Sequence, residues 1–411
     1  MSTNSRVVAT TPAVGFNAVW WYSSPVVKPI HIVLTTRQFA PCIGGTETYT
    51  RESLRRLVAR GYKVTVITMN RNLWTGERLA REEWIDGIRV LRIAFLKFPL
   101  RPLGLCNPWW LWRQLREADV VQNGDMRFLF EACLLAKIFL RKPLVFTSHG
   151  YILHQQKLLW LKKLVFRYYY KPLFRWGDAL QVVSYQDRDK VADVLPPEKI
   201  VLVLGGVDVA KFTGEIRQPE AGRLLYFGRI DSHKGVDLLL EALARVRAPF
   251  RLRVVFGSSH AETLAAWKAQ AERLGLGGRV DWVGAIDHGA LRQEMARAQA
   301  VVFPSRYEGF GLTTLEAMAA GAVVVCNRIE AFENIVREGQ NGFLVDFLSP
   351  ERAAAALEKV LALAPEQSES LARAAAQEAA RHDWSARIPT LEKMYRHLVS
   401  PSLRGEAEAI S

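Results

Sequence analysis

The sequence predicts an α/β protein made of two doubly wound, Rossmann-like domains that face each other across a cleft. The chain has 411 residues, which is more than one hydrophobic core usually supports, so two domains are expected. Short β-branched or aromatic runs alternate with helical stretches in both halves, a pattern typical of parallel sheets covered by helices. The composition, with 49% hydrophobic and 23% charged residues, argues against a disordered chain.

The first half starts with a strand–loop–helix–strand unit. A buried strand is expected at 29–36, followed by the loop "RQFAPCIGGTE", a helix from about Glu47 to Arg60 and a strand at 63–68. Gly61 lies where a glycine cap ends a helix. This βαβ order implies a parallel sheet. Further strands of this half are expected at 118–122, 144–148 and 179–184.

The second half repeats the alternation after a stretch rich in Gly and polar residues. We therefore expect an N-terminal extension at 1–28, a first domain at 29–208, a linker at 209–222 and a second domain at 223–383. A last amphipathic stretch, 384–400, is expected to pack back on the first domain. No run of eighteen apolar residues and no convincing secretory signal are present, which predicts a cytoplasmic protein without a spanning helix.

The stretch "FPSRYEGFGLTTLEAMAAG", residues 303–321, predicts a ligand site. It leaves the end of an expected strand, where open parallel sheets bind ligands, and enters a helix whose first N–H groups suit a diphosphate. Gly309 and Gly311 let the backbone approach a ligand. Glu316 and Glu308 can accept hydrogen bonds from sugar hydroxyls. This favours a nucleotide diphosphate carrying a sugar, although the spacing alone is equally consistent with two surface carboxylates.

Several motifs together resemble one enzyme family. Besides the stretch above, they are "LYFGRIDSHKGVDLLLEAL", "GGVDVAKF", "ENIVREGQNGFLV" and "IGGTETYTRESLRRLVARGYKVTVIT". With them the chain resembles the retaining glycosyltransferases of family 4, of the bacterial cell-envelope and exopolysaccharide type, over roughly 29–399. The resemblance implies the GT-B fold. It also implies that the first domain binds the acceptor and the second binds the nucleotide sugar.

The resemblance also implies roles for individual residues. Glu316 would hold the ribose and Glu308 the donor sugar, and His149 in "FTSHG" would lie beside that sugar and help transfer. Arg229 and Lys234 would neutralise the diphosphate as it leaves, rather than being ordinary surface cations. The remaining donor contacts would come from Gly44, Gly45, Gly309, Phe310, Gly311, Leu312 and Thr313.

No cofactor and no metal are expected, because two cations can replace a metal ion at a leaving diphosphate. Asp187 and Asp189 in "QDRDK" form a D-x-D that binds metal in another glycosyltransferase fold, but here they are interpreted as a solvated helix start. The four cysteines lie far apart and suggest no zinc site. Retention of anomeric configuration, by front-face substitution, is what the resemblance implies.

The charge is concentrated in the first half, which carries 30 basic and 16 acidic residues up to Asp208, against 25 and 25 after it. Two stretches without acids, 87–116 and 151–177, hold twelve of these basic residues. In the second, a basic stripe and an apolar face with aromatic residues predict a helix at an anionic membrane surface. Its expected contacts are Lys157, Lys162, Lys163, Arg167 and Lys171. A buried helix rimmed by lysines is the alternative.

The predicted function is transfer of a hexose from a UDP- or GDP-sugar to a lipid-linked or saccharide acceptor, at the inner face of the cell membrane. Nucleic acid is not expected as a partner, because no recognition motif accompanies the charge. Two alternatives remain: a sugar-nucleotide 2-epimerase, which shares the two-domain architecture, and a non-catalytic sugar-nucleotide binder at the membrane. The base, the sugar and the acceptor are left open.

Overall fold

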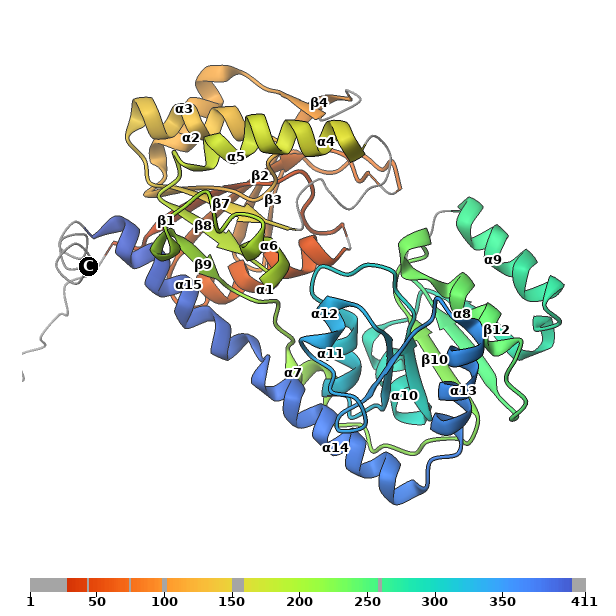
Figure 1. Ribbon diagram of the computed structural model, residues 1–411. Helices are drawn as coiled ribbons and strands as arrows, with labels where there is room; N and C mark the ends of the chain where they lie inside the picture. The colour runs from red at the N-terminus through yellow and green to blue at the C-terminus, as the bar shows by residue number, and fades with distance from the viewer. Residues whose placement is uncertain are drawn as a thin grey trace, which may run out of the picture.

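The structure is a computed structural model that describes residues 28–42, 44–73, 75–97, 102–149, 159–257 and 261–400. The chain forms two α/β lobes, each built on its own largely parallel sheet (Figure 1). The predicted fold class is therefore confirmed. Most of the expected N-terminal extension and Lys157 lie outside the described residues.

The first lobe has a nine-stranded sheet of order β3-β4-β2-β1-β6-β7-β8-β9, with β5 paired to β4. Only β3 and β5 run antiparallel to their neighbour β4. The strands are β1 (His31–Thr35), β2 (Lys63–Met69), β3 (Glu82–Ile85), β4 (Ile88–Lys97), β5 (Pro102–Leu105), β6 (Val120–Asn123), β7 (Leu144–Ser148), β8 (Ala179–Val182) and β9 (Ile200–Leu202).

Helices cover both faces of this sheet. One face packs against α2 (Pro108–Glu117), α3 (Phe130–Leu140) and the run formed by α4 (Leu159–Val165), a π-helical turn (Phe166–Tyr170) and α5 (Lys171–Phe174). The other face packs against α1 (Gly45–Val58) and α15 (Trp384–Val399). The short α6 (Tyr185–Asp189) follows β8.

Strands β3, β4 and β5 were not predicted. Arginines interrupt the apolar pattern of β4, and β3 and β5 are only four residues long. The structure explains how these arginines are accommodated. The side chain of Arg92 in β4 is fully buried and forms an ion pair with Glu83 of the neighbouring β3. Arg89 pairs with Glu82 at 2.7 Å. Part of the basic stretch 87–116 is therefore neutralised within the sheet and is not available to an external partner.

The second lobe has a six-stranded parallel sheet of order β12-β11-β10-β13-β14-β15. Its strands are β10 (Arg223–Phe227), β11 (Arg251–Val255), β12 (Val280–Gly284), β13 (Ala300–Phe303), β14 (Val324–Asn327) and β15 (Phe343–Val345). Its helices are α8 (Val236–Leu243), α9 (Ala261–Arg273), α10 (His288–Arg297), α11 (Leu312–Ala319), α12 (Glu330–Glu333), α13 (Pro350–Leu361) and α14 (Pro365–Arg381).

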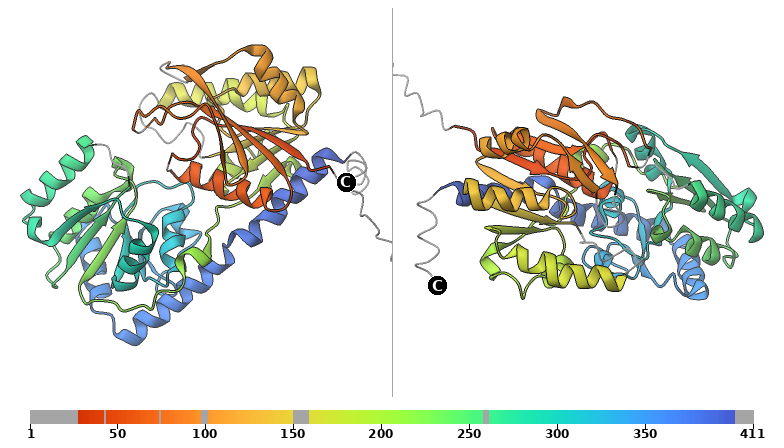
Figure 2. Two further views of the ribbon diagram at one scale, coloured as in Figure 1. Left: turned by 180° about the vertical axis from the view of Figure 1, so that it is seen from behind. Right: turned by 90° about the horizontal axis from the view of Figure 1, so that it is seen from above.

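Two chain segments connect the lobes. The first runs from β9 through Gly205 and Gly206 to α7 (Val209–Phe212). A Cβ atom on Gly205 would lie 2.5 Å from Phe310 Cδ1, and one on Gly206 would lie 2.7 Å from Trp384 Cδ2, so only glycine fits this crossing. The second is the helical run of α14 and α15, which returns along both lobes (Figure 2).

Candidate active site

An ion pair links the ends of two neighbouring strands of the second sheet. Lys234 lies in the 3₁₀ turn Ser232–Lys234 after β10, and Glu308 lies in the loop after β13. Lys234 Nζ is 2.7 Å from Glu308 Oε1, and the Ser305 hydroxyl donates to the same oxygen at 2.7 Å. Because both strands are parallel and adjacent, their carboxyl ends bring these side chains together at the edge where ligands bind.

Glu308 is ionised at neutral pH. Burial raises the pKa of Glu308, but the charge and hydrogen bond of Lys234 and the hydrogen bond of Ser305 outweigh it, so the pKa lies below its usual value. A carboxylate held in this way can accept hydrogen bonds from sugar hydroxyls. Lys234 can at the same time attract a phosphate.

Helix α11 begins directly after this loop. Gly311 caps it with φ of 91°, a conformation that strains any other residue except occasionally Asn or Asp. Leu312 and Thr313 are the first residues of the helix, whose amides have no acceptor one turn back and are therefore free for an anion. Phe310 is buried against Gly205, which fixes the loop against the interlobe crossing. Gly309 has open space where a Cβ would project.

Glu316 lies further along α11, as the sequence predicts. It is partly buried, and its carboxyl group makes no hydrogen bond to any residue in the described ranges. Burial raises its pKa to about 7, while Lys211 opposes and Glu52 reinforces this shift. An unpaired carboxyl at this depth is suited to accept hydrogen bonds from a ligand.

Residues of both lobes meet at the beginning of α1. Glu47 lies in the first turn of this helix, and burial raises its pKa, whereas Arg229 of the second lobe and Arg37 of the first lower it. A Cβ on Gly44, the N-cap, would lie 2.2 Å from Glu47 Oε2, so a larger residue there would displace the Glu47 carboxylate. Gly45 has open space around it. The glycine loop and Arg229 are thus on facing edges of the lobes.

His149 follows β7 at the same edge of the first sheet. Its ring contacts Tyr49 edge-on, with 5.4 Å between ring centroids. Burial lowers its pKa to about 4, and Asp125 only partly opposes this effect. His149 is therefore neutral at pH 7, so it can donate or accept a hydrogen bond but cannot act as a cation.

Models of known protein families match both lobes of the chain. A model described as Glycosyltransferase Family 4 matches residues 43–211, and one described as Glycosyl transferases group 1 matches residues 213–378. The chain is 30% identical over 369 residues to the GDP-mannose:cellobiosyl-diphosphopolyprenol alpha-mannosyltransferase of Xanthomonas campestris, covering 87% of this chain and 93% of that protein. The chain belongs to glycosyltransferase family 4.

A second relative of this glycosyltransferase carries the same name in Komagataeibacter xylinus, with 27% identity over 389 residues and coverage of 92% and 95%. Among solved structures, a sucrose-phosphate synthase from Thermosynechococcus elongatus superposes with a TM-score of 0.70 at 22% identity, covering 90% of this chain and 99% of that chain. This likeness concerns the fold, and it agrees with the GT-B architecture.

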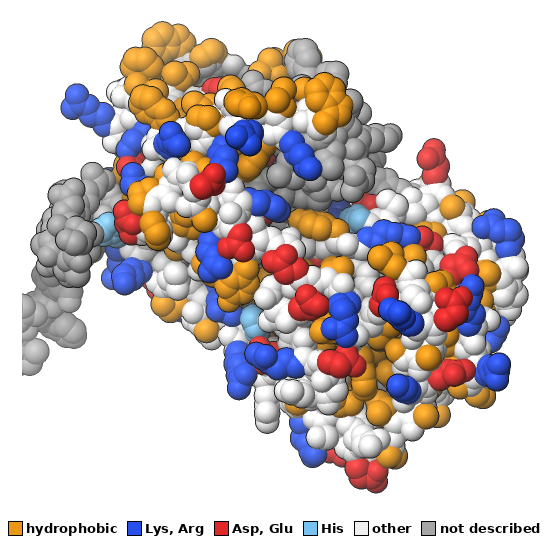
Figure 3. All heavy atoms as spheres, in the orientation of Figure 1, with side chains coloured by type: hydrophobic (Ala, Val, Ile, Leu, Met, Phe, Trp, Pro, Cys, Tyr) orange, Lys and Arg blue, Asp and Glu red, His pale blue; other side chains and the backbone are white. Residues whose placement is uncertain are grey.

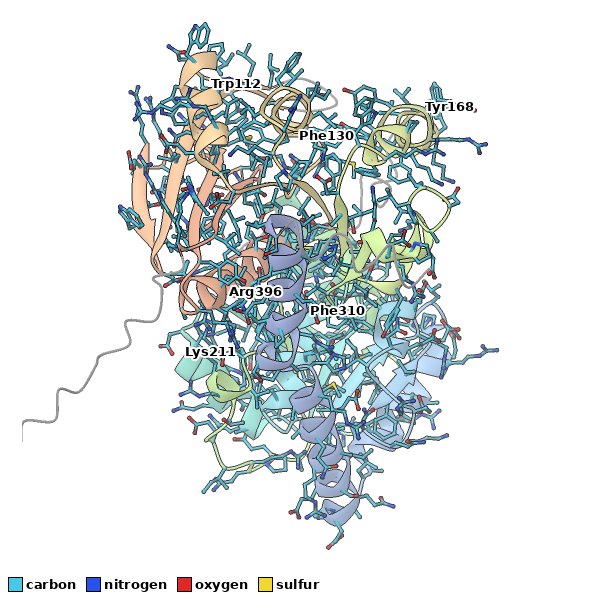
Figure 4. The ribbon with its side chains drawn as sticks, turned by 90° about the vertical axis from the view of Figure 1, so that its left-hand side faces the viewer. Trp112, Phe130, Tyr168, Lys211, Phe310 and Arg396 are labelled. Atoms are coloured by element: carbon cyan, nitrogen blue, oxygen red, sulfur yellow. The ribbon has the colours of Figure 1, made fainter. Side chains whose placement is uncertain are left out.

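A charged network that no local sequence pattern predicts joins the two lobes of the transferase. Glu52 of α1 contacts Arg55 and Arg56 one turn later and Lys211 of α7 at 2.9 Å. Asp208 of the crossing segment accepts from both arginines, at 2.6 and 2.9 Å. The spacing of Glu52, Arg55 and Arg56 signals pairs within a helix, but no local pattern shows that Asp208 and Lys211 complete the network. Figure 4 shows Lys211 near the junction of the lobes.

The structure corrects the interpretation of the D-x-D sequence in the transferase. Asp189 has an exposed side chain, as expected for a solvated helix start, but Asp187 is only 1% exposed. Asp187 accepts a hydrogen bond from Ser148 at 3.0 Å, and its amide donates to the Ser184 side chain. Asp187 therefore ties the start of α6 to the end of β7, a tertiary contact that local sequence does not reveal.

The predicted basic stripe of the transferase is shorter in the structure. Lys163 and Arg167 are exposed and Lys162 is partly exposed, but Lys171 forms an ion pair with Asp193 at 2.6 Å. The π-helical turn Phe166–Tyr170 interrupts the regular α-helix within this stripe. Tyr168, expected on the apolar face of this helix, is 69% exposed.

Proposed function

We propose that this glycosyltransferase moves mannose from GDP-mannose to a lipid-linked saccharide, with retention of configuration. The observation that carries the proposal is the buried Lys234–Glu308 pair beside the start of α11. It provides a carboxylate for the sugar, a cation for the diphosphate and free helix amides in one place. The choice of GDP-mannose and of a lipid-linked acceptor rests on the names of the two mannosyltransferase relatives.

In the proposed reaction the donor diphosphate lies at the amides of Leu312 and Thr313, with Lys234 and Arg229 stabilising the charge that develops on it. Glu308 holds the hydroxyls of mannose, and Glu316 holds the ribose. Neutral His149 orients the donor sugar from the first lobe. The C1–O bond to the diphosphate breaks as the acceptor oxygen attacks the same face, and a diphosphate oxygen takes the acceptor proton. These fixed cations make a metal ion unnecessary.

An exposed apolar and basic surface supports a membrane location. The helices α2 to α5 on the outer side of the first lobe expose large hydrophobic side chains, with basic side chains just below them (Figure 3). The apolar members are Trp109, Leu135, Ile138, Phe139, Trp160, Leu164, Tyr168 and Trp176. Trp112 and Tyr168 mark this surface, far from Phe310 at the lobe junction, in Figure 4. We call it the outer helical surface.

The outer helical surface has the composition of a membrane interface, with aromatic and aliphatic groups next to cations. A groove of about 350 Å³ lies between segment 166–175 and residues Asp193 and Val194. Because Lys171 is paired with Asp193, Arg167 and Arg175 supply the positive charge that suits a lipid phosphate. No described helix is long and apolar enough to cross a bilayer. We therefore propose peripheral attachment to an anionic leaflet, in which each Lys or Arg contributes about 1 kcal/mol.

The experiment is a transfer assay with purified protein, a cellobiosyl-diphospholipid acceptor and either radiolabelled GDP-mannose or UDP-glucose. Mannose should enter the lipid fraction in the presence of a chelator, with α-configuration at the new bond. Glu316→Ala should abolish transfer. The control is Glu333→Ala, which removes a half-exposed carboxylate on α12 and should leave transfer intact. Transfer from UDP-glucose alone would refute the donor assignment, and conversion of the donor to its epimer without transfer would refute the reaction.

A further inference from the structure

Two arginines flank one carboxylate at the carboxyl edge of the first sheet. Arg37 follows β1 and Arg127 follows β6, and these two strands are neighbours. Arg37 Nε is 3.2 Å from Asp125 Oδ2, and Arg127 donates to the same carboxylate at 3.2 and 3.3 Å. With all three groups ionised, this arginine pair carries one positive charge more than Asp125 neutralises.

The positive charge is held in a protected place. The three side chains are between 14% and 29% exposed, and Arg37 Nε is buried without a hydrogen-bond acceptor among the described residues. Burial and the charge of Arg127 lower the pKa of Arg37, and Asp125 and Glu47 offset this only in part. A buried guanidinium that shares its carboxylate with a second arginine costs stability, unless a further anion binds there.

The arginine pair lies between the reaction centre and the outer helical surface. On one side, β6 is also the neighbour of β7, so the arginine pair lies at the same sheet edge as His149, which follows β7. On the other side, Arg127 precedes α3 by three residues, and the exposed Leu135, Ile138 and Phe139 of α3 belong to the outer helical surface. The order is therefore reaction centre, arginine pair and outer helical surface. A lipid-linked diphosphate sugar has its parts in the same order: sugar, diphosphate and lipid.

We propose that Arg37 and Arg127 bind the diphosphate of the lipid-linked acceptor. This inference rests on the proposed function, because it assigns a subsite to its acceptor. Each guanidinium presents a planar fork that matches two phosphate oxygens. Asp125 positions both guanidinium groups. When the diphosphate binds, it replaces some of the contacts between Asp125 and the arginines.

The test measures binding without turnover, so that it does not depend on the transfer assay. Geranyl diphosphate is titrated calorimetrically into wild type and variants, with GDP saturating the donor site throughout. Arg37→Gln and Arg127→Gln should each weaken binding by about 10- to 100-fold, as expected for losing hydrogen bonds to a charged group. Asp125→Asn should tighten binding, because it removes the competing anion. Arg373→Gln, an exposed arginine of α14, should bind as wild type.

The opposite signs distinguish a binding role from a structural one. If Asp125→Asn weakens binding as much as the arginine variants do, the cluster only maintains the fold and the proposal is wrong. Unchanged binding in both arginine variants refutes it as well. If neither arginine variant folds, the Asp125→Asn result decides alone. Arginine-dependent binding with no mannose transfer would refute the proposed function and leave the diphosphate site standing.

Discussion

Lys234 and Glu308 form a buried ion pair, with 2.7 Å between Nζ and Oε1 and both side chains 11% exposed. Each residue leaves a buried charge behind when the other is removed. Lys234→Met should therefore lower the free energy of unfolding by about 3–5 kcal/mol. The double variant Lys234→Met/Glu308→Gln should lose less free energy of unfolding than Lys234→Met alone, because no unpaired charge remains buried. Urea denaturation at pH 7 measures both, and a double variant less stable than Lys234→Met would contradict the pairing.

Glu316 should lower the free energy of unfolding at alkaline pH, although its carboxylate is needed to bind the donor. Its pKa of about 7 in the fold exceeds the usual 4.5, so folding favours the protonated form, and its contribution to stability falls as pH rises from about 4.5 through 7. Glu316→Gln imitates the protonated form. At pH 8 it should raise the free energy of unfolding by about 1–3 kcal/mol, with little change at pH 4.5.

The same Glu316→Gln variant should bind GDP-mannose less tightly, because an amide offers one acceptor where the carboxylate offers two. Urea titrations at both pH values and calorimetry with the donor give the two readouts. A variant that is less stable than wild type at pH 8 would show that burial does not govern this carboxyl.

The Glu52 network should make the joint between the lobes sensitive to acid. Burial raises the pKa of Glu52, but hydrogen bonds from Arg55, Lys211 and Arg56 lower it to about 2. Its stabilising effect is complete above pH 4.5 and is lost as pH falls toward 2. Glu52→Gln should cost about 2–3 kcal/mol at pH 7 and clearly less at pH 3.5, measured by urea denaturation.

A matched control for Glu52 is Glu369, whose pair with Arg373 is two-thirds exposed. Glu369→Gln should change the free energy of unfolding by about 0.5 kcal/mol or less at either pH. Equal losses for the two variants would mean that Glu52 acts no differently from a surface carboxylate.

The outer helical surface should attach the protein to anionic vesicles. Changing Lys162, Lys163 and Arg167 to Glu should abolish sedimentation with phosphatidylglycerol vesicles, because three positive charges at the interface become negative. The triple change of Lys268, Arg273 and Lys359 to Glu, in exposed positions of the second lobe, alters the net charge equally and should leave sedimentation intact. Equal loss in both variants would attribute the effect to net charge.

Sequence predicted the parts of the site that lie on one local motif. Residues 303–321 predict three features of the site: the glycine loop, the start of the helix after Gly311 and the two glutamates. They do so because strand, loop and helix are contiguous in this segment. The Lys234–Glu308 contact could not be read in this way. It depends on β10 and β13 being neighbours in the sheet, although 74 residues separate the two side chains.

The sequence pattern also did not show which charged side chains are buried. Asp187, interpreted from the sequence as part of a solvated helix start, is 1% exposed and accepts a hydrogen bond from Ser148. Arg92, between Leu91 and Ile93 in β4, is buried and forms an ion pair with Glu83 of the neighbouring β3. Neither partner follows from the local sequence. The arginine pair could not be predicted for the same reason. Arg37 and Arg127 come together only because β1 and β6 are neighbours in the sheet.

The return of α15 to the first lobe has a consequence for biosynthesis. Trp384, Ile388 and Leu391 fill the core beneath α1, and the Tyr395 hydroxyl donates to Gln122 at 2.5 Å. A chain growing on the ribosome therefore exposes the apolar underside of its first sheet until the final helix has left the exit tunnel. The sheet of the second lobe forms without α15, so this lobe can fold before α15 is available. The first lobe is synthesised earlier but can complete its core only after α15 has been added.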